Sequence, residues 1–281
     1  MNPSSNPAKP AGRSSSISLS QAAGQAVSKI PAASSAARKS RKKQAKKAGE
    51  CLECEKRHIF LLLMFVGGYY GAFTFTVRGG VFCNAQTANF VLMSIALGSG
   101  LWLKAAYYLI PMSAYFLGSV ISEALPGRIR KKHQIRWDTV LIGLEMVSVF
   151  VLGLIPDSWP FQITQVAVNF ICAMQYNTFR MARGIPMATV FCTNHVRQLG
   201  IHFVKWVKHD HSKQEAERLQ MHLSMLGTFI LGAVFSTILA HHFGGKAIWF
   251  ALLPLSYLFT DLLYADLALE KKDLSRIPAG H

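Results

Sequence analysis

Apolar residues along this chain gather into runs long enough to cross a lipid bilayer. The run 59–77 contains 19 residues without Asp, Glu, Lys or Arg, and the runs 105–122 and 223–240 contain 18 each. A bilayer core of about 30 Å requires roughly 20 helical residues, so each run is long enough for one transmembrane helix. The pattern predicts an integral membrane protein built from helices.

Three further apolar stretches predict additional spans, and between the runs lie two segments whose pattern fits either a crossing or a segment that does not cross. The further stretches are 139–155, 159–179 and 247–264. Segment 85–103 is apolar enough to span, whereas segment 186–207 carries basic and histidine side chains that make it a poor span. The pattern therefore leaves a choice between six and eight crossings.

The distribution of lysine and arginine favours six crossings. If neither segment crosses, the cytoplasmic regions hold 27 of the 30 Lys and Arg residues, as the positive-inside rule expects. Eight crossings would place the five cations of the loop 126–138 on the outside. We therefore expect both termini in the cytoplasm, with 85–103 dipping in from outside and 186–207 lying at or dipping from the inner face.

These expectations combine into one fold: an all-α, polytopic membrane helix bundle with six spans and two re-entrant or interfacial helical segments. Each segment follows the first helix of a three-helix half, which predicts a 3+3 inverted repeat. A shift of 105 residues supports the repeat. It pairs Arg78 with Arg183, Gly79 with Gly184, Asn89 with Asn194 and Val91 with Val196.

Charge and composition divide the chain into three parts: a basic tail at 1–57, a transmembrane domain at 58–266 and a cytoplasmic C-terminal tail at 267–281. Residues 1–57 carry 12 Lys and Arg against three Glu, and few large apolar residues precede residue 48. We expect residues 1–47 to be disordered. The polybasic block 38–47 is interpreted as a topology signal beside anionic lipids, and the alternative is a dedicated lipid or nucleic-acid site. We expect no nucleic-acid partner.

Polar residues in the two segments are the first candidates for a substrate path. Gly79 and Gly80 allow a backbone turn, and Thr or Asn at a helix start can cap it. In the second segment, Pro186 suits a first helical turn. The candidates in the two segments are Arg78, Asn84, Thr87, Asn89, Arg183, Thr189 and Asn194. The alternative is that these residues only cap helices and form turns.

Glu145 is the remaining path candidate, because it lies in the middle of the run 139–155. An acid at membrane depth is a candidate proton carrier or cation ligand, and the alternative is a neutral, hydrogen-bonded carboxylic acid. In the stretch 159–179, Gln162, Gln165 and Asn169 share one helix face. They could line a cavity or hold helices together.

Other chemistry is weakly represented in the sequence. Cys51, Cys54 and His58 resemble half of a zinc site, one ligand short of a tetrahedral set. We favour reduced or acylated juxtamembrane cysteines there, and expect no metal and no cofactor. Walker, dinucleotide, nucleophile-elbow and metalloprotease motifs are absent from the sequence, so we expect a protein that is not an enzyme.

The first segment also carries a resemblance to a known family. After the glycine-rich run 67–71, the aromatic Phe75 is followed by Gly-Gly-Val-Phe over 79–82 and then by Asn-x-x-Thr-x-Asn over 84–89. This order resembles the YoaK-like family of bacterial membrane proteins, a family of unknown function, from about residue 59 to 266. The family's Thr-Gly-Asn marker stands here as Thr87-Ala88-Asn89, and the acid that the family tends to place after its first glycines is missing. The resemblance implies a multi-pass protein of the bacterial cytoplasmic membrane.

The sequence thus predicts transport of a small solute or ion as the leading function. The competing hypothesis is a membrane interaction or scaffold protein that transports nothing. The residues name no substrate and no coupling ion. The expected partners are the lipid bilayer, anionic lipids at the basic tail and a small solute or ion.

Overall fold

Long α-helices dominate the described part of the chain, which comprises residues 51–130, 135–208 and 210–279 of the computed structural model. The expected disordered tail 1–47 and its polybasic block 38–47 lie outside the described residues. Residues from Cys51 onward form one compact unit.

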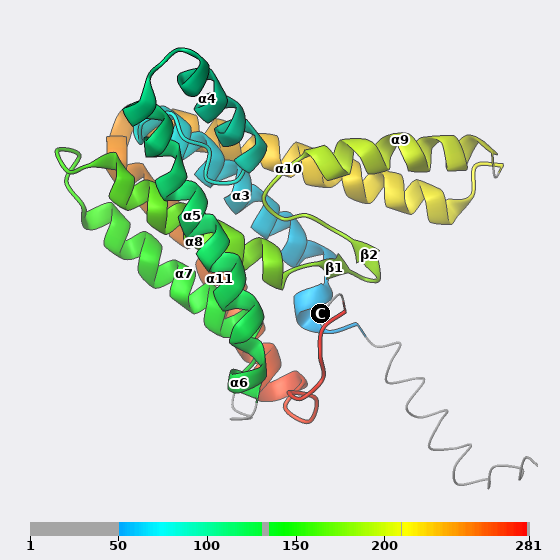
Figure 1. Cartoon of the computed structure of the whole chain (residues 1–281). Coiled ribbons are helices and arrows are strands. Elements are labelled where there is room, and N and C mark those ends of the chain that lie inside the picture. Colours follow the sequence, from blue (N-terminus) through cyan, green and yellow to red (C-terminus); the bar gives the residue numbers. More distant parts are fainter. Residues whose placement is uncertain (1–50, 131–134, 209, 280–281) are drawn as a thin grey trace, which may run out of the picture. The chain divides into compact units, whose positions relative to one another are not determined.

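Figure 1 labels the helices and strands and colours them in chain order. The first half contains η2 (Glu53–Glu55), α3 (Arg57–Val77), α4 (Gln86–Gly98), α5 (Trp102–Ala124), α6 (Pro126–Arg130) and α7 (Trp137–Leu154). The second half contains α8 (Phe161–Thr178), β1 (Met181–Ala182), β2 (Ile185–Pro186), α9 (Thr193–Lys208), α10 (Lys213–Phe243), η3 (Gly244–Ala251), α11 (Leu252–Tyr264) and η4 (Ala265–Leu269).

Several helices have the length and composition of membrane spans. Among the described residues, 4 helical stretches qualify: Arg57–Val77, Trp102–Ile129, Trp137–Leu154 and Lys213–Leu269. The last stretch contains two of the expected runs, 223–240 and 247–264. Helix α8 covers the remaining run, and its Gln and Asn side chains make it less apolar. The prediction of a mostly helical protein with helices long and apolar enough to span a membrane is therefore confirmed, whereas the number of crossings stays a prediction.

Glycines allow the most extensive helix contacts to form backbone against backbone. In the pair α3 and α10, a Cβ at Gly68 would overlap the carbonyl oxygen of Phe229. In the pair α5 and α8, a Cβ at Gly118 would overlap the carbonyl oxygen of Phe170. Close approach of this kind is typical of helices packed in a membrane, where small residues line the interfaces.

The segments 85–103 and 186–207 each contribute one shorter helix. Helix α4 packs on α5, and α9 packs along α10, as Figure 1 shows. Gly100, with a φ of 72°, turns the chain from α4 into α5. Both helices carry exposed apolar side chains, including Phe90 on α4 and Phe203 on α9.

The second segment differs from the sequence prediction at its start. Pro186 was expected in a first helical turn, but it lies in β2, where it is paired with Met181, and α9 begins only at Thr193. The turn between β1 and β2 is made by Arg183 and Gly184, which both have positive φ, as tight hairpin turns require. Within the described ranges, this two-stranded ribbon is the departure from an all-α fold.

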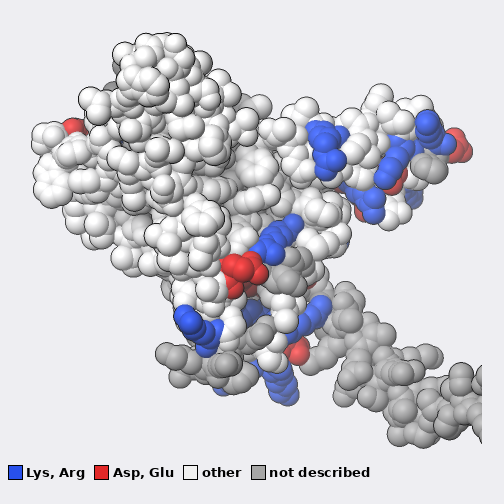
Figure 2. All heavy atoms as spheres, viewed as in Figure 1, with Lys and Arg blue, Asp and Glu red and all other residues white. Residues whose placement is uncertain are grey.

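Charge is unevenly distributed over the surface. On the face drawn in Figure 2, charged side chains are sparse over α4, α5 and α8 and numerous on the α9 and α10 hairpin. Bulky apolar side chains are also exposed on α5, including Leu103, which is 91% exposed. Water would disfavour such a surface, whereas lipid tails would cover it.

Candidate functional site

The loop between α3 and α4 is held by the side chain of Asn89. Its Nδ2 group donates to the carbonyl oxygen of Phe82 at 2.7 Å, and its Oδ1 accepts from the Phe82 N–H at 3.2 Å. Asn89 is fully buried. The Asn89 amide therefore satisfies both backbone groups of Phe82, which a neighbouring strand or helix would otherwise satisfy. These two bonds fix the loop against the start of α4.

Amides on α8 extend this network. The Nε2 group of Gln165 donates to the carbonyl oxygen of Arg78, while its Oε1 accepts from the Tyr107 hydroxyl at 2.6 Å. One turn later, Asn169 Oδ1 accepts from Gln86 Nε2 at 2.8 Å. The polar face predicted for α8 is thus used to hold the first segment in place.

Arg78 is buried and directly follows Val77, the last residue of α3. Its side chain is 2% exposed, and Nη1 lies 2.8 Å from Asp157 Oδ1 in the turn between α7 and α8. The guanidinium carbon lies 5.7 Å from the centre of the Phe73 ring. Neither Nε nor Nη2 has a hydrogen-bond partner among the described residues. Arg78 is therefore a partly unsatisfied, buried cation.

Two candidates from different segments meet at the glycines of α3. Asn84 Nδ2 donates to the carbonyl oxygen of Gly67 at 3.0 Å. A Cβ at Gly67 would lie 2.5 Å from the carbonyl oxygen of Thr189, and one at Gly71 would lie 2.7 Å from Asn84 Nδ2. The Thr189 hydroxyl is buried and has no hydrogen-bond partner in the described ranges. The glycines of the first helix make room for both segments at this crossing.

The remaining candidates of the two segments lie elsewhere. Thr87 is exposed on the first turn of α4. Arg183 is exposed at the tip of the β1 and β2 hairpin, and its N–H donates to the carbonyl oxygen of Glu55 at 3.1 Å. Asn194 is partly exposed and accepts from Arg197 Nη2 at 3.5 Å. The structure therefore does not join Asn194 to Asn89 in one site.

Glu145 lies in the middle of α7 and is fully buried. The Tyr70 hydroxyl is the polar neighbour that interacts with its carboxyl group, although no hydrogen bond of ordinary geometry reaches either carboxylate oxygen from the described residues. Cys172 on α8 also faces Glu145, and its Sγ lies 3.7 Å from the Sγ of Cys83. An unsatisfied carboxyl group in this position requires a proton or a cation to be stable.

A group of histidines joins α9 to α10, and the sequence interpretation did not find it. The Nδ1 atoms of His195 and His222 are 3.0 Å apart, and His195 Nε2 lies 2.8 Å from the carbonyl oxygen of Ala188. His202 Nδ1 lies 2.5 Å from Glu215 Oε2. Burial lowers the pKa of His195. The spacing of seven residues between His195 and His202 places both on one helix face, and this signal could have revealed the group.

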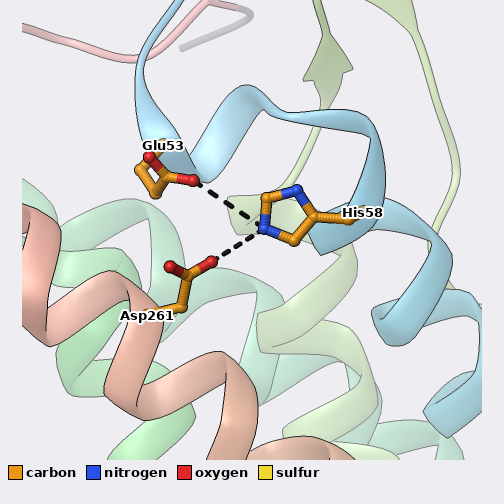
Figure 3. Close-up of side chains that lie close together, drawn as sticks. All are labelled: Glu53, His58 and Asp261. Carbon is orange, nitrogen blue, oxygen red and sulfur yellow. Dashed lines mark hydrogen bonds and ion pairs between the residues drawn. The ribbon is translucent and has the colours of Figure 1, made fainter.

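Cys51, Cys54 and His58, which resemble half of a zinc site in the sequence, are not brought together. Cys51 Sγ lies 3.5 Å from the carbonyl oxygen of Leu52, and Cys54 is buried beside Asp138. His58 instead faces two carboxylates from other elements, Glu53 on η2 and Asp261 on α11, as Figure 3 shows. The Asp261 contact joins residues 203 positions apart in the chain, so a local motif could not have indicated it.

Comparison with known proteins places this architecture in a family. Residues 59–260 match the family model described as "Protein of unknown function (DUF1275)". The chain belongs to DUF1275. YoaK-like proteins are part of this family, so the resemblance found in the first segment is confirmed. No curated protein and no solved structure matches the chain.

The matched region of this DUF1275 protein contains the glycines of α3, both segments and Glu145. Glu53, His58 and Asp261 lie just outside it. The family description names no activity, so the function of this DUF1275 protein has to be argued from its side chains.

Proposed function

We propose that this protein carries a proton or a small cation across the membrane, alone or together with a small solute, and that Glu145 binds the ion. The observation that carries the proposal is the full burial of this carboxyl group, which has the Tyr70 hydroxyl as a polar neighbour and no hydrogen bond of ordinary geometry to either oxygen in the described part of the chain. A structural acid would be expected to have its oxygens satisfied. An acid that binds and releases an ion needs lone pairs that the protein leaves free.

The proposed architecture has six spans, both termini in the cytoplasm and an inverted repeat that relates α3, α4, α5 and α7 to α8, α9, α10 and α11. Helix contacts support it, because α3 packs on α10 as α8 packs on α5, and α4 packs on α5 as α9 packs on α10. Two of the carbonyl oxygens covered by glycines, those of Phe65 and Phe170, are 105 positions apart, which is the shift found in the sequence.

The proposed path runs past the crossing of the two segments at α3. Asn84, Thr189 and Glu145 all lie against this helix or face its side chains, and the Thr189 hydroxyl is left without a partner among the described residues. Transporters with inverted repeats bind their substrates where such interrupted segments meet. Asn89 would position the first segment and would not touch the solute.

A scaffold without transport remains the second candidate function, and one observation favours it. The buried amides of Asn89 and Gln165 are used by hydrogen bonds within the protein. Amides that contact a solute would be expected to have unused donors or acceptors. The two functions differ in what they predict for Glu145.

The proposal is tested in liposomes that contain the purified full chain and a pH-sensitive dye. A pH step should cause a faster change of internal pH in the wild type than in empty liposomes, with Na⁺ or K⁺ gradients as parallel conditions. Glu145→Gln should abolish the flux because it keeps the shape and removes the titratable group. Glu217→Gln, at an exposed site on α10, is the matched control and should retain the flux. Equal leakage from all four preparations would reject the proposal and favour the scaffold.

A further inference from the structure

We propose that Glu53, His58 and Asp261 form a binding site for a divalent transition-metal ion where the start of α3 meets α11. The site does not depend on the proposed transport. The ligand atoms of the three residues all lie within 4.8 Å of one another, and no other group of three His, Cys, Asp or Glu residues in the described ranges comes as close.

Figure 3 shows that both carboxylates approach the same atom of His58. The Nε2 atom lies 2.7 Å from Asp261 Oδ2 and 3.7 Å from Glu53 Oε1. Metal–ligand bonds of about 2.0–2.2 Å place neighbouring ligand atoms at separations of this order. A single ion at the point of convergence can therefore bond to all three side chains after small side-chain movements.

The three donor atoms favour some divalent ions over others. One imidazole nitrogen and two carboxylate oxygens suit Mn²⁺, Fe²⁺ or Zn²⁺, whereas Ca²⁺ and Mg²⁺ prefer oxygen ligands alone. Binding would keep the imidazole neutral, with its proton on Nδ1 and the Nε2 lone pair directed at the ion. Three protein ligands would leave at least one position for water.

Neighbouring contacts hold Glu53 in a suitable orientation. Its side chain is 6% exposed, and Lys56 Nζ lies 2.6 Å from Oε2, which leaves Oε1 directed towards His58. Its backbone N–H donates to Glu270 Oε1 at 2.8 Å, and Glu270 Oε2 is held by Arg136 at 2.6 Å. The carboxylate is thus positioned by its surroundings before an ion binds, as the ligands of metal sites generally are.

The alternative is a plain ion pair in which a protonated His58 bridges the two carboxylates. The two cases differ in response to metal. An ion would join the segment before α3 to α11 and would stabilise the folded state according to its concentration, whereas an ion pair would be indifferent to it.

The experiment uses the full chain in detergent, freed of metal with EDTA and titrated with MnCl₂, while electron paramagnetic resonance measures the unbound ion. Mn²⁺ is chosen because it binds poorly to thiols, so the five cysteines do not interfere. We expect one saturable site per chain. His58→Ala and Asp261→Asn should each weaken it by about tenfold or more, since the loss of a supporting contact alone typically costs 10–100-fold.

Matched controls separate this site from general binding. His241→Ala and Glu217→Gln remove exposed residues of α10 and should leave the affinity unchanged. Lys56→Gln should tighten binding, because it removes a competing cation from Glu53. Thermal unfolding should show a stabilising shift with Mn²⁺ in the wild type and in both controls. The absence of saturable binding, or equal affinity in wild type, His58→Ala and Asp261→Asn, would overturn the proposal.

Discussion

Gly232 of α10 lies directly against the carbonyl oxygen of Phe65 on α3, so closely that a Cβ on the glycine would overlap that oxygen. Three residues towards the C-terminus of α3, Gly68 has the same relation to the carbonyl oxygen of Phe229. The two helices therefore touch through their backbones at two points. This contact depends on the absence of side chains at both glycines.

A methyl group at Gly232 should separate the two helices. We expect Gly232→Ala to lower the free energy of unfolding by about 1–3 kcal/mol, the usual cost of overpacking. Gly227 lies on the same helix, and a Cβ there would meet no atom of the described residues within 4 Å. Gly227→Ala should therefore be neutral or stabilise by about 0.5–1 kcal/mol, because alanine is the better helix former. Denaturation of both variants in the same detergent would measure the difference, and equal effects would contradict the packing.

Asn89 should matter more for stability than Asn194, although both were candidates for one path. Asn89→Ala leaves the N–H and carbonyl groups of Phe82 without their partner, which should cost about 1–3 kcal/mol. Asn194→Ala removes one contact of 3.5 Å at a partly exposed site and should change stability by less than about 0.5 kcal/mol. Unfolding midpoints of the two variants would check this order. A larger loss of stability for Asn194→Ala would show that the second segment contributes more to the stability of the fold than the first.

Replacing Glu145 by an apolar residue should not destabilise the fold. No hydrogen bond of ordinary geometry reaches its buried carboxylate oxygens in the described part of the chain, so Glu145→Leu removes a poorly satisfied polar group and adds apolar contacts, which should offset the lost interaction with Tyr70. We expect an unchanged or higher unfolding temperature together with a loss of ion flux. A strongly lowered unfolding temperature would indicate instead that the carboxylic acid holds α7 to its neighbours.

The α9 and α10 hairpin should loosen in mild acid. Burial lowers the pKa of His195, so below the ordinary histidine value of about 6.5 the unfolded chain binds a proton that the folded state resists. Stability should therefore fall as the pH decreases from about 7.5 to 5.5. The Nδ1 atom of His222 lies 3.0 Å from that of His195. The ring of His202 stacks on the ring of His222, and its Nδ1 atom contacts Glu215.

The contribution of His195 is isolated by substitution. His195→Gln should reduce the pH dependence of the unfolding temperature, while His241→Gln, at an exposed position of α10, should leave it unchanged. The same slope in wild type and His195→Gln would assign the acid sensitivity to other groups.

The six-span topology can be tested with single cysteines in a chain whose five native cysteines are replaced. Gly127→Cys lies in the loop that carries five cations, and should be shielded from an impermeant thiol reagent applied to intact cells. Ser158→Cys lies in the exposed turn between α7 and α8 and should react. Labelling of residue 127 from outside would reject the proposed orientation.

Features set by neighbouring residues could be predicted from the sequence. Helix length and composition depend on consecutive residues, so the runs beginning at Ile59 and Leu223 were identified as helices. The turn at Gly79 and Gly80 could also be predicted from the local sequence, because both residues adopt a positive φ, which favours glycine. Glu145 was recognised because an acid in an apolar run requires an explanation on its own.

Partners distant in the sequence were decided by tertiary packing. Nothing in the segment 84–89 indicates that Asn89 pairs with Phe82, because the hydrogen bonds depend on how the loop folds back. The sequence predicts Pro186 in a first helical turn. In the structure, Pro186 pairs with Met181 in the two-stranded ribbon, so α9 begins only at Thr193. Glu53, His58 and Asp261 converge only when α3 and α11 pack together. Hydropathy reports which segments leave water, whereas the contacts between their side chains follow from the geometry of packing.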